Sequence, residues 1–248
     1  MAQKSDTNGV LIIGPPRSGT TLLAGLVAEH PRAGVTMEGM GHDARYLMGV
    51  KVWANKLCVP NQITLEPVPD QRTLYQRLED GLRAVLGRPR LRGKIRDHDP
   101  AYYAPPKHRQ TTIQTYVDQW GTDILAIVRD PDQTVASIQK RGNERLSSDQ
   151  ARHRWAKAIH IIKNTHERWP GRVYFVTFAD LLLDTENTLK GVCKYLGVEF
   201  EPDMLNGYIN TPQYENKCID TEKAKKEAPS CNMKTYDLEA FHFYKSLK

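Results

Sequence analysis

One segment, VLIIGPPRSGTT at residues 10–21, constrains the fold more than any other part of the chain. It begins with a short continuous apolar run, which is typical of a strand buried on both faces of a parallel sheet. It then passes through a glycine-bearing turn into a run of apolar residues with helical spacing. The backbone N–H groups at the start of such a helix have no partner within the helix and can bind an anion. The segment therefore predicts an α/β fold that holds a phosphate-like group.

Strand-like and helix-like segments alternate along the rest of the chain. Further strands are predicted at residues 34–37, at DILAIV before the Arg-Asp-Pro of residues 129–131, at residues 172–178 and in RGKIRDHDP; helices are predicted after Thr21 and at residues 72–86, 132–141, 148–168 and 185–196. This alternation favours a P-loop-type, doubly wound parallel sheet flanked by helices, with ligands at the carboxyl ends of the strands. The length of 248 residues suits one domain. We expect residues 1–9 to be flexible and residues from about 206 to 248 to be irregular.

Composition excludes several classes of protein. The chain has 35 Lys and Arg against 29 Asp and Glu, a mild excess that favours anionic ligands without indicating a nucleic-acid binder. Its polar amino terminus leads into an apolar run too short for a signal peptide or a membrane span, so we expect a cytoplasmic protein. The four cysteines are Cys58, Cys193, Cys218 and Cys231. They show neither zinc-site spacing nor a disulfide framework, and no metal is expected.

The glycine-bearing turn departs from the phosphate loop of nucleotide hydrolases at one position. The pattern GxxxxGK[ST] is met at Gly14 and Gly19, but Thr20 stands where the lysine belongs. A basic residue is present three positions earlier, at Arg17, whose planar guanidinium suits phosphate or sulfate oxygens. Hydroxyl donors follow it at Ser18, Thr20 and Thr21. The turn predicts an anion site in which an arginine replaces the lysine.

A second candidate anion site lies in IVRDPDQTVASI. Arg129 and Ser137 are eight residues apart, on either side of a strand end and the first turns of a helix. That turn can bring a guanidinium and a hydroxyl together around a terminal phosphate. Taken alone, the same residues also suit an ordinary turn and helix.

Together the two motifs resemble those of the sulfotransferases that use 3′-phosphoadenosine-5′-phosphosulfate (PAPS). GPPRSGTTLL is similar to the 5′-phosphosulfate loop of the tyrosylprotein-type and many bacterial members, whereas cytosolic small-molecule members have Lys at position 17 and Trp at position 22. The resemblance covers about residues 10–40 and 94–205. It implies that Arg17, Ser18, Gly19, Thr20 and Thr21 bind the phosphosulfate and that Arg129 and Ser137 bind the 3′-phosphate. PAPS would then be the co-substrate and PAP the product.

The resemblance also suggests candidates for the catalytic base. Glu38 follows Arg17 by 21 positions, the spacing at which tyrosylprotein-type sulfotransferases carry their glutamate base. His98 is the rival, since cytosolic members use a histidine after an equivalent strand, and Lys94 is an auxiliary candidate. We expect Glu38 to be the base and Arg17 to stabilise charge on the leaving group.

Two other functions stay open on the sequence. A P-loop nucleotide kinase or NTPase would use Asp130 as its magnesium-binding carboxylate, and a non-catalytic nucleotide-binding protein would keep the fold without turnover. The acceptor class is not indicated, whether small molecule, carbohydrate or peptide. Side chains considered for its pocket are Tyr46, Trp53, Tyr102 and Tyr103, and the lysines considered for closing over the 3′-phosphate are Lys223, Lys225 and Lys226. No oligomeric state is predicted.

Overall fold

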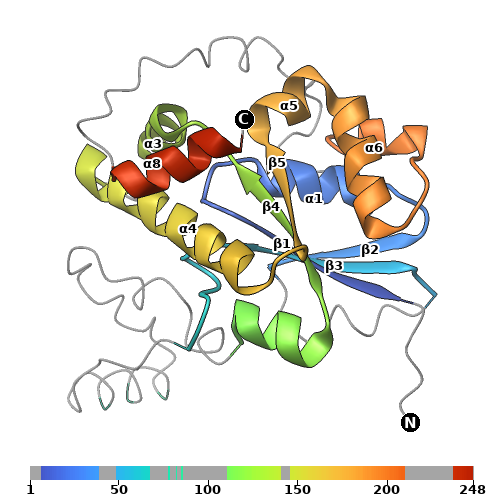
Figure 1. The fold of residues 1–248 in the computed structure, drawn as a ribbon, viewed down its shortest axis with the longest axis horizontal. Helices are drawn as coiled ribbons and strands as arrows, with labels where there is room; N and C mark the ends of the chain where they lie inside the picture. The colour runs from blue at the N-terminus through green and yellow to red at the C-terminus, as the bar shows by residue number, and fades with distance from the viewer. Residues whose placement is uncertain are drawn as a thin grey trace.

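The computed structural model describes residues 7–38, 49–67, 78, 82, 85, 111–140, 146–209 and 237–247. Within these ranges five strands form one sheet, in the order β2-β3-β1-β4-β5, and every neighbouring pair is parallel. The strands are β1 Asn8–Gly14, β2 Ala33–Met37, β3 Val52–Cys58, β4 Asp123–Val128 and β5 Val173–Thr177. The prediction of an α/β fold with a parallel sheet flanked by helices is confirmed (Figure 1).

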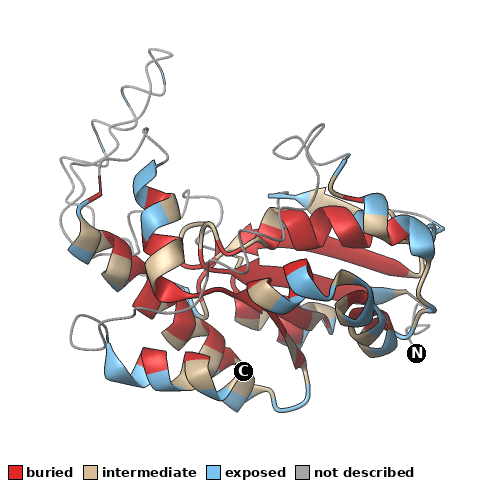
Figure 2. Cartoon of the chain, turned by 90° about the horizontal axis from the view of Figure 1, so that it is seen from above, coloured by how far each residue is buried: buried red, intermediate tan, exposed pale blue. Residues whose placement is uncertain are grey.

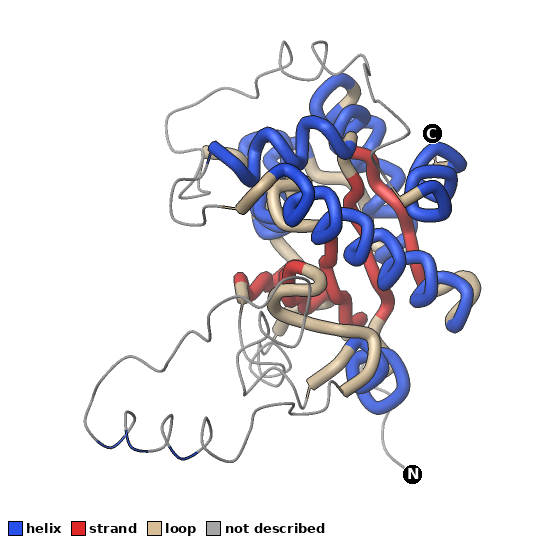
Figure 3. Tube along the Cα trace, turned by 90° about the vertical axis from the view of Figure 1, so that its left-hand side faces the viewer, coloured by secondary structure: helices blue, strands red, loops and turns tan. Residues whose placement is uncertain are grey.

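Helices cover both faces of this sheet. One face is packed by α1 Thr20–Ala28, α5 Phe178–Leu183, α6 Thr185–Leu196 and the 3₁₀ helix at Pro202–Asn206. The other face is packed by α3 Pro131–Lys140, α4 Ser148–Arg168, α8 Leu238–Ser246 and a π-helical turn at Thr115–Gln119. Figure 3, which looks from the side of α4, shows this long helix crossing in front of the strands.

The central strand explains why the apolar run at the start of the chain is continuous. Side chains of successive residues in a strand point to opposite faces. Val10 and Ile12 pack with the α1 side, whereas Leu11 and Ile13 pack with the α4 side, and all four are buried. Burial is concentrated in the strands and in the inward faces of the helices (Figure 2).

The sequence prediction missed β3, the strand beside β1. Its residues Asn55 and Lys56 interrupt the apolar pattern, yet both side chains are buried. Asn55 Nδ2 donates to Tyr116 Oη at 2.7 Å, and Lys56 Nζ lies 2.6 Å from a carboxylate oxygen of Glu38. Because both partners are remote in sequence, the apolar pattern of these residues alone does not predict the strand. The strand expected in RGKIRDHDP lies outside the described residues.

The bounds of the predicted helices agree well with those of the observed helices in the parts of the chain that the structure describes. Helix α4 spans Ser148–Arg168 and α6 spans Thr185–Leu196, as expected, and Gly197 ends α6 in the left-handed conformation. The predicted helix at 132–141 begins one residue earlier, as α3. Of the helix expected at residues 72–86, only residues 78, 82 and 85 are described, and they are helical.

Both ends of the chain differ from the prediction. The strand β1 begins at Asn8, inside the stretch expected to be flexible. The carboxyl-terminal region is not irregular throughout, because α8 packs onto α4 through the buried side chains of Ala240 and Tyr244. The ring of Tyr244 meets Trp155 edge to face at 5.9 Å between centroids. This helix was missed because its apolar residues are buried only by packing against a helix some eighty positions earlier in the chain.

Candidate active site

The loop between β1 and α1 has two positions, Gly14 and Gly19, at which no Cβ atom fits. Gly19 has a φ of 96°, and a Cβ there would lie closer than 3.0 Å to the ring of Phe178. A Cβ on Gly14 would lie 2.5 Å from the carbonyl oxygen of Ile127. Arg17 adopts the same left-handed region, with a φ of 72°. The spacing of the motif is therefore set by steric fit against β4 and α5.

Ser18 differs from its predicted role. Its side chain is fully buried, and its Oγ donates to the carbonyl oxygen of Pro15 at 2.6 Å. Its backbone N–H also donates to Pro15, at 3.1 Å. The hydroxyl expected to face a ligand instead holds the loop in shape. Thr20 and Thr21, in contrast, both line the cavity described next.

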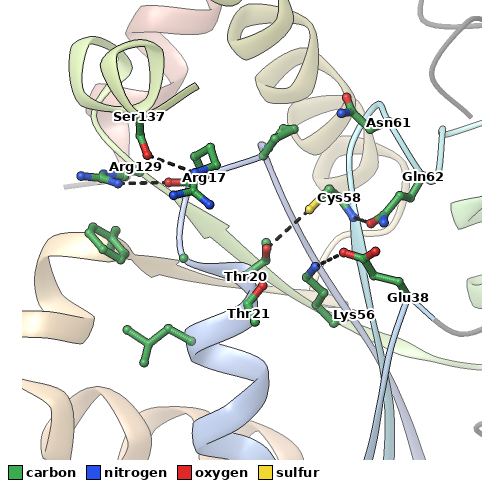
Figure 4. A pocket seen from close by; sticks show the side chains of 14 residues that line it. Arg17, Thr20, Thr21, Glu38, Lys56, Cys58, Asn61, Gln62, Arg129 and Ser137 are labelled. Carbon is green, nitrogen blue, oxygen red and sulfur yellow. Dashed lines mark hydrogen bonds and ion pairs between the residues drawn. The ribbon is translucent and has the colours of Figure 1, made fainter. Parts of the chain in front are cut away.

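A cavity of about 360 Å³ lies at the carboxyl edge of the sheet, above the loop (Figure 4). Each of β1, β2, β3, β4 and β5 ends at or next to a residue of this cavity or its loop. The described residues that line it are Pro16, Arg17, Gly19, Thr20, Thr21, Leu22, Glu38, Lys56, Cys58, Asn61, Gln62, Arg129, Ser137 and Phe178.

On one side of the cavity the structure brings together three residues predicted from two separate motifs. Arg17 Nε donates to Ser137 Oγ at 3.1 Å, and Arg129 Nη1 donates to the carbonyl oxygen of Arg17 at 3.1 Å. The guanidinium of Arg129 also donates to Gln133 Oε1 and lies 4.3 Å from the ring centroid of Phe178. Two permanent positive charges and a hydroxyl thus converge on one wall, an arrangement suited to phosphate oxygens.

On the other side Glu38 forms an ion pair with Lys56. Glu38 directly follows β2 and has a φ of 61°; Lys56 lies on β3, opposite Met37 in the register. Lys56 Nζ is 2.6 Å from Glu38 Oε1, and the lysine side chain is 4% exposed while the glutamate side chain is 50% exposed. A buried ammonium must be paired, so Lys56 holds the carboxylate at the cavity rim.

Besides the apolar Pro16, Leu22 and Phe178, sequence reasoning missed four cavity residues that come from β3 and the turn after it. They are Lys56, Cys58, Asn61 and Gln62. Cys58 Sγ lies 3.6 Å from Thr20 Oγ1, and the backbone N–H of Cys58 donates to Gln62 Oε1 at 2.7 Å. A signal was present: lysine inside the apolar stretch VWANKLCVP is hard to bury without a charged partner.

Other predicted residues take no part in the described cavity. Trp53 packs in the core against Gly9, and Asp130 accepts a hydrogen bond from the backbone N–H of Gln133 at the start of α3. Neither lines the cavity. The remaining candidates lie outside the described residues: Tyr46, Lys94, His98, Tyr102, Tyr103, Lys223, Lys225 and Lys226.

Across the parts of the chain that the structure describes, no helix is both long and apolar enough to cross a membrane.

The chain was compared with known protein families, curated proteins and solved structures. A family model described as "Sulfotransferase family" matches residues 121–202, which contain β4, Arg129, Ser137 and β5. No curated protein matches the sequence.

Two solved structures share the fold across nearly the whole chain. The sulfotransferase domain from the curacin biosynthetic pathway is 16% identical, with a TM-score of 0.52 and coverage of 97% of each chain. The sulfotransferase domain from the Synechococcus PCC 7002 olefin synthase is 16% identical, with a TM-score of 0.53 and coverage of 97% of this chain and 94% of that one. The chain is thus similar to the sulfotransferase family over residues 121–202, and it shares the fold of these two sulfotransferase domains.

Proposed function

We propose that this protein transfers a sulfuryl group from PAPS to a hydroxyl or amine acceptor, directly and in line, with Glu38 as the base. The observation that carries the proposal is the cavity itself. One wall presents Arg17, Arg129 and Ser137, and the opposite wall presents the Glu38–Lys56 pair. This arrangement supports a site in which an anionic donor and a proton acceptor face each other across one cavity.

Donor binding uses the wall that carries both arginines. The 5′-phosphosulfate is held by Arg17, the hydroxyls of Thr20 and Thr21, and the backbone N–H groups at the start of α1. The 3′-phosphate is held by Arg129 and Ser137. In the structure these two side chains are hydrogen-bonded to Arg17 and Gln133, and phosphate oxygens would replace those partners.

The chemical step moves one proton and one sulfuryl group. Glu38 accepts the proton of the acceptor hydroxyl, and the oxygen lone pair forms a new S–O bond. At the same time the S–O bond to the 5′-phosphate breaks, and its electron pair leaves on the bridging oxygen of PAP. Arg17 and Lys56 stabilise the negative charge that develops there. Lys56 also fixes the position of the carboxylate, since its ammonium is 2.6 Å away.

The kinase alternative lacks a supporting observation. It requires a lysine at position 20 and a carboxylate at the phosphates. Thr20 occupies the first position, and Asp130 is engaged at the start of α3 rather than lining the cavity.

Thermal melting with nucleotides tests the donor. PAP should raise the melting temperature and ATP with Mg²⁺ should not, because preferential binding to the native state stabilises it by about 2.7 kcal/mol at a ligand concentration of 100 Kd. A rise with ATP and Mg²⁺ and none with PAP would favour a kinase.

The base is tested by Glu38→Gln. This variant should bind PAP as the wild type does and lose sulfate transfer, because the amide cannot accept the proton. Glu186→Gln is the matched control, since Glu186 is exposed on α6, forms an ion pair there with Lys190 and does not line the cavity. Full turnover in Glu38→Gln would exclude the base assignment. PAP binding without transfer to any acceptor in the wild type would indicate a non-catalytic binder.

A further inference from the structure

Arg129 lies at a junction between two elements, and its side chain depends on how the backbone there is held. It directly follows β4, which ends at Val128, and comes just before α3. The residue is buried, and its guanidinium reaches Gln133 Oε1 at 2.8 Å and the carbonyl oxygen of Arg17 at 3.1 Å. Hydrogen bonds from a guanidinium need a narrow range of distances. A small shift of the backbone at Arg129 would therefore move the guanidinium away from the place where it serves the cavity.

The backbone of Arg129 is held by Trp155, a residue of α4. The indole Nε1–H of Trp155 donates to the carbonyl oxygen of Arg129 at 3.2 Å, and both residues are buried. An indole has one N–H donor and no acceptor, and here this donor is directed at the backbone of a cavity residue. Removing it would take a hydrogen bond from a buried carbonyl oxygen, which is unfavourable and frees the backbone to shift.

The ring of Trp155 is in turn packed by the carboxyl-terminal helix α8, which lies against α4 (Figure 1). Tyr244 of α8 is buried and meets Trp155 edge to face, at 5.9 Å between ring centroids, an arrangement that aromatic pairs prefer. The start of α8 is also tied to α4, since Lys163 Nζ lies 3.1 Å from Glu239 Oε1. A line of contacts therefore runs from α8 through Trp155 to the backbone at the cavity.

We propose that Trp155 is a positioning residue for the nucleotide, and that the packing of α8 on it determines how tightly the site binds a 3′-phosphate. This inference rests on the proposed function, in which Arg129 holds the 3′-phosphate. Trp155 is fully buried and is not among the described residues that line the cavity, so it acts through Arg129. The 5′-phosphate is held by the loop and the start of α1 in the proposed function. Loss of the Trp155 contact should therefore weaken nucleotides that carry a 3′-phosphate and spare those that lack one.

Two nucleotides separate this positioning role from a merely structural one. PAP carries a 3′-phosphate, whereas adenosine 5′-monophosphate (AMP) lacks it and is otherwise the same. In isothermal titration calorimetry, Trp155→Phe should bind PAP about tenfold more weakly, as for the loss of one hydrogen bond to a charged group, and AMP within about twofold of the wild type.

Trp169→Phe is the matched control for Trp155→Phe. Trp169 directly follows α4, and its Nε1–H donates to Asp118 Oδ1 at 2.9 Å. The variant therefore loses the same indole N–H from the same helix, at a residue that does not line the cavity. It should keep the wild-type ratio of PAP affinity to AMP affinity.

Tyr244→Leu tests the part played by α8 and keeps the hydrogen bond from Trp155. It should lower the PAP affinity about threefold, the size expected for one aromatic pair, and leave the AMP affinity unchanged. Phe243→Leu is its control, because the ring of Phe243, one residue earlier on α8, meets Phe175 of β5 at 5.9 Å. Far-UV circular dichroism shows whether each variant is folded at the temperature of the titration.

The ratio of PAP affinity to AMP affinity decides the outcome. A wild-type ratio in folded Trp155→Phe, or the same loss of ratio in Trp169→Phe, overturns this inference and leaves the proposed function standing. If Trp155→Phe does not fold, equal ratios in Tyr244→Leu and Phe243→Leu overturn it instead. A wild type that binds PAP no more tightly than AMP overturns the proposed function, and this inference with it.

Discussion

Arg17 and Gly19 have positive φ angles for different physical reasons. At Gly19 the left-handed conformation coincides with a contact to the Phe178 ring that leaves no room for a Cβ. At Arg17 a side chain is tolerated in that region, and its guanidinium is held by Ser137. The loop therefore accepts the strain of one non-glycine residue where that residue carries the charge of the site.

Gly19→Ala is predicted to be much more destabilising than Gly121→Ala. Both glycines have positive φ, 96° and 65°, but the space around a Cβ at Gly121 is empty to 4 Å. Gly121→Ala should cost about 1–2 kcal/mol of unfolding free energy from backbone conformation alone. Gly19→Ala adds overlap with Phe178, which costs a further 1–3 kcal/mol, roughly. Urea unfolding measures both, and equal effects would show that the overlap relaxes without cost.

Alkylation of Cys58 is predicted to block PAP binding. Its thiol is partly exposed in the cavity and lies 3.6 Å from Thr20 Oγ1, so an added acetamide group would occupy the space above the phosphate loop. Cys193 is different, since burial raises the pKa of its thiol to about 11 and keeps it protonated and unreactive at neutral pH. After treatment with iodoacetamide, wild-type protein should no longer melt at a higher temperature with PAP.

Cys58→Ser is the control for this experiment. It should keep the PAP-induced rise in melting temperature after the same treatment, and PAP added first should protect the wild type. If treated Cys58→Ser also loses PAP binding, the effect comes from another cysteine.

At the scale of elements, the cap of α8 couples the end of the chain to α4. Asp237 Oδ1 accepts from the backbone N–H of Ala240 at 3.0 Å, and its Oδ2 lies 3.1 Å from His160 Nε2 on α4. The hydrogen bond from Ala240, and then the one from His160, lower the pKa of the Asp237 carboxyl. Its folded pKa is therefore below its unfolded value, so this stabilisation is present above about pH 4 and is lost as pH falls through the folded pKa.

Asp237→Ala is predicted to lower the unfolding free energy by about 1 kcal/mol at pH 7, the usual cost of losing an N-cap. The difference from the wild type should shrink when urea unfolding is repeated below about pH 4. Asp237→Asn keeps a capping oxygen without the charge, so it should be less destabilising than Asp237→Ala and should show less pH dependence relative to the wild type. A difference that is constant with pH would contradict the role of the charge.

At the scale of the whole molecule, two apolar clusters share one sheet. One cluster joins the sheet to α1, α5 and α6, and the other joins it to α3, α4 and α8. Because alternate residues of the same strands enter both clusters, neither can form without the sheet. The cavity lies at the edge where these strands end, so its geometry depends on both clusters.

This arrangement predicts one cooperative unfolding transition. Leu23→Ala, in the α1 cluster, and Ile159→Ala, in the α4 cluster, each remove a fully buried side chain. Each should lower the unfolding free energy by about 2–5 kcal/mol with an unchanged dependence on urea. Far-UV circular dichroism and tryptophan fluorescence should report the same midpoint. Two separate transitions, with each variant shifting only one, would show that the two sides unfold independently.

Local patterns in the sequence were sufficient for the strand, loop and helix around Arg17, for the strand before Arg129, and for both ends of α4 and α6. These features depend on interactions within a few residues, such as the Ser147 cap of α4 and the left-handed Gly197 after α6. The sequence also identified Arg17, Arg129, Ser137 and Glu38 as cavity residues.

Tertiary structure decided which polar residues of β3 belong to the site, and it decided that α8 forms near the carboxyl end of the chain. Asn55 and Lys56 read as breaks in an apolar run, and they become strand residues only because Tyr116 and Glu38 supply partners from other elements. Ser18 reads as a ligand donor, but the fold of the loop turns its hydroxyl onto Pro15. Helix α8 depends in the same way on Trp155. Local periodicity records the conformational preferences of neighbouring residues, whereas burying a polar or isolated apolar group depends on partners that only the folded chain brings near.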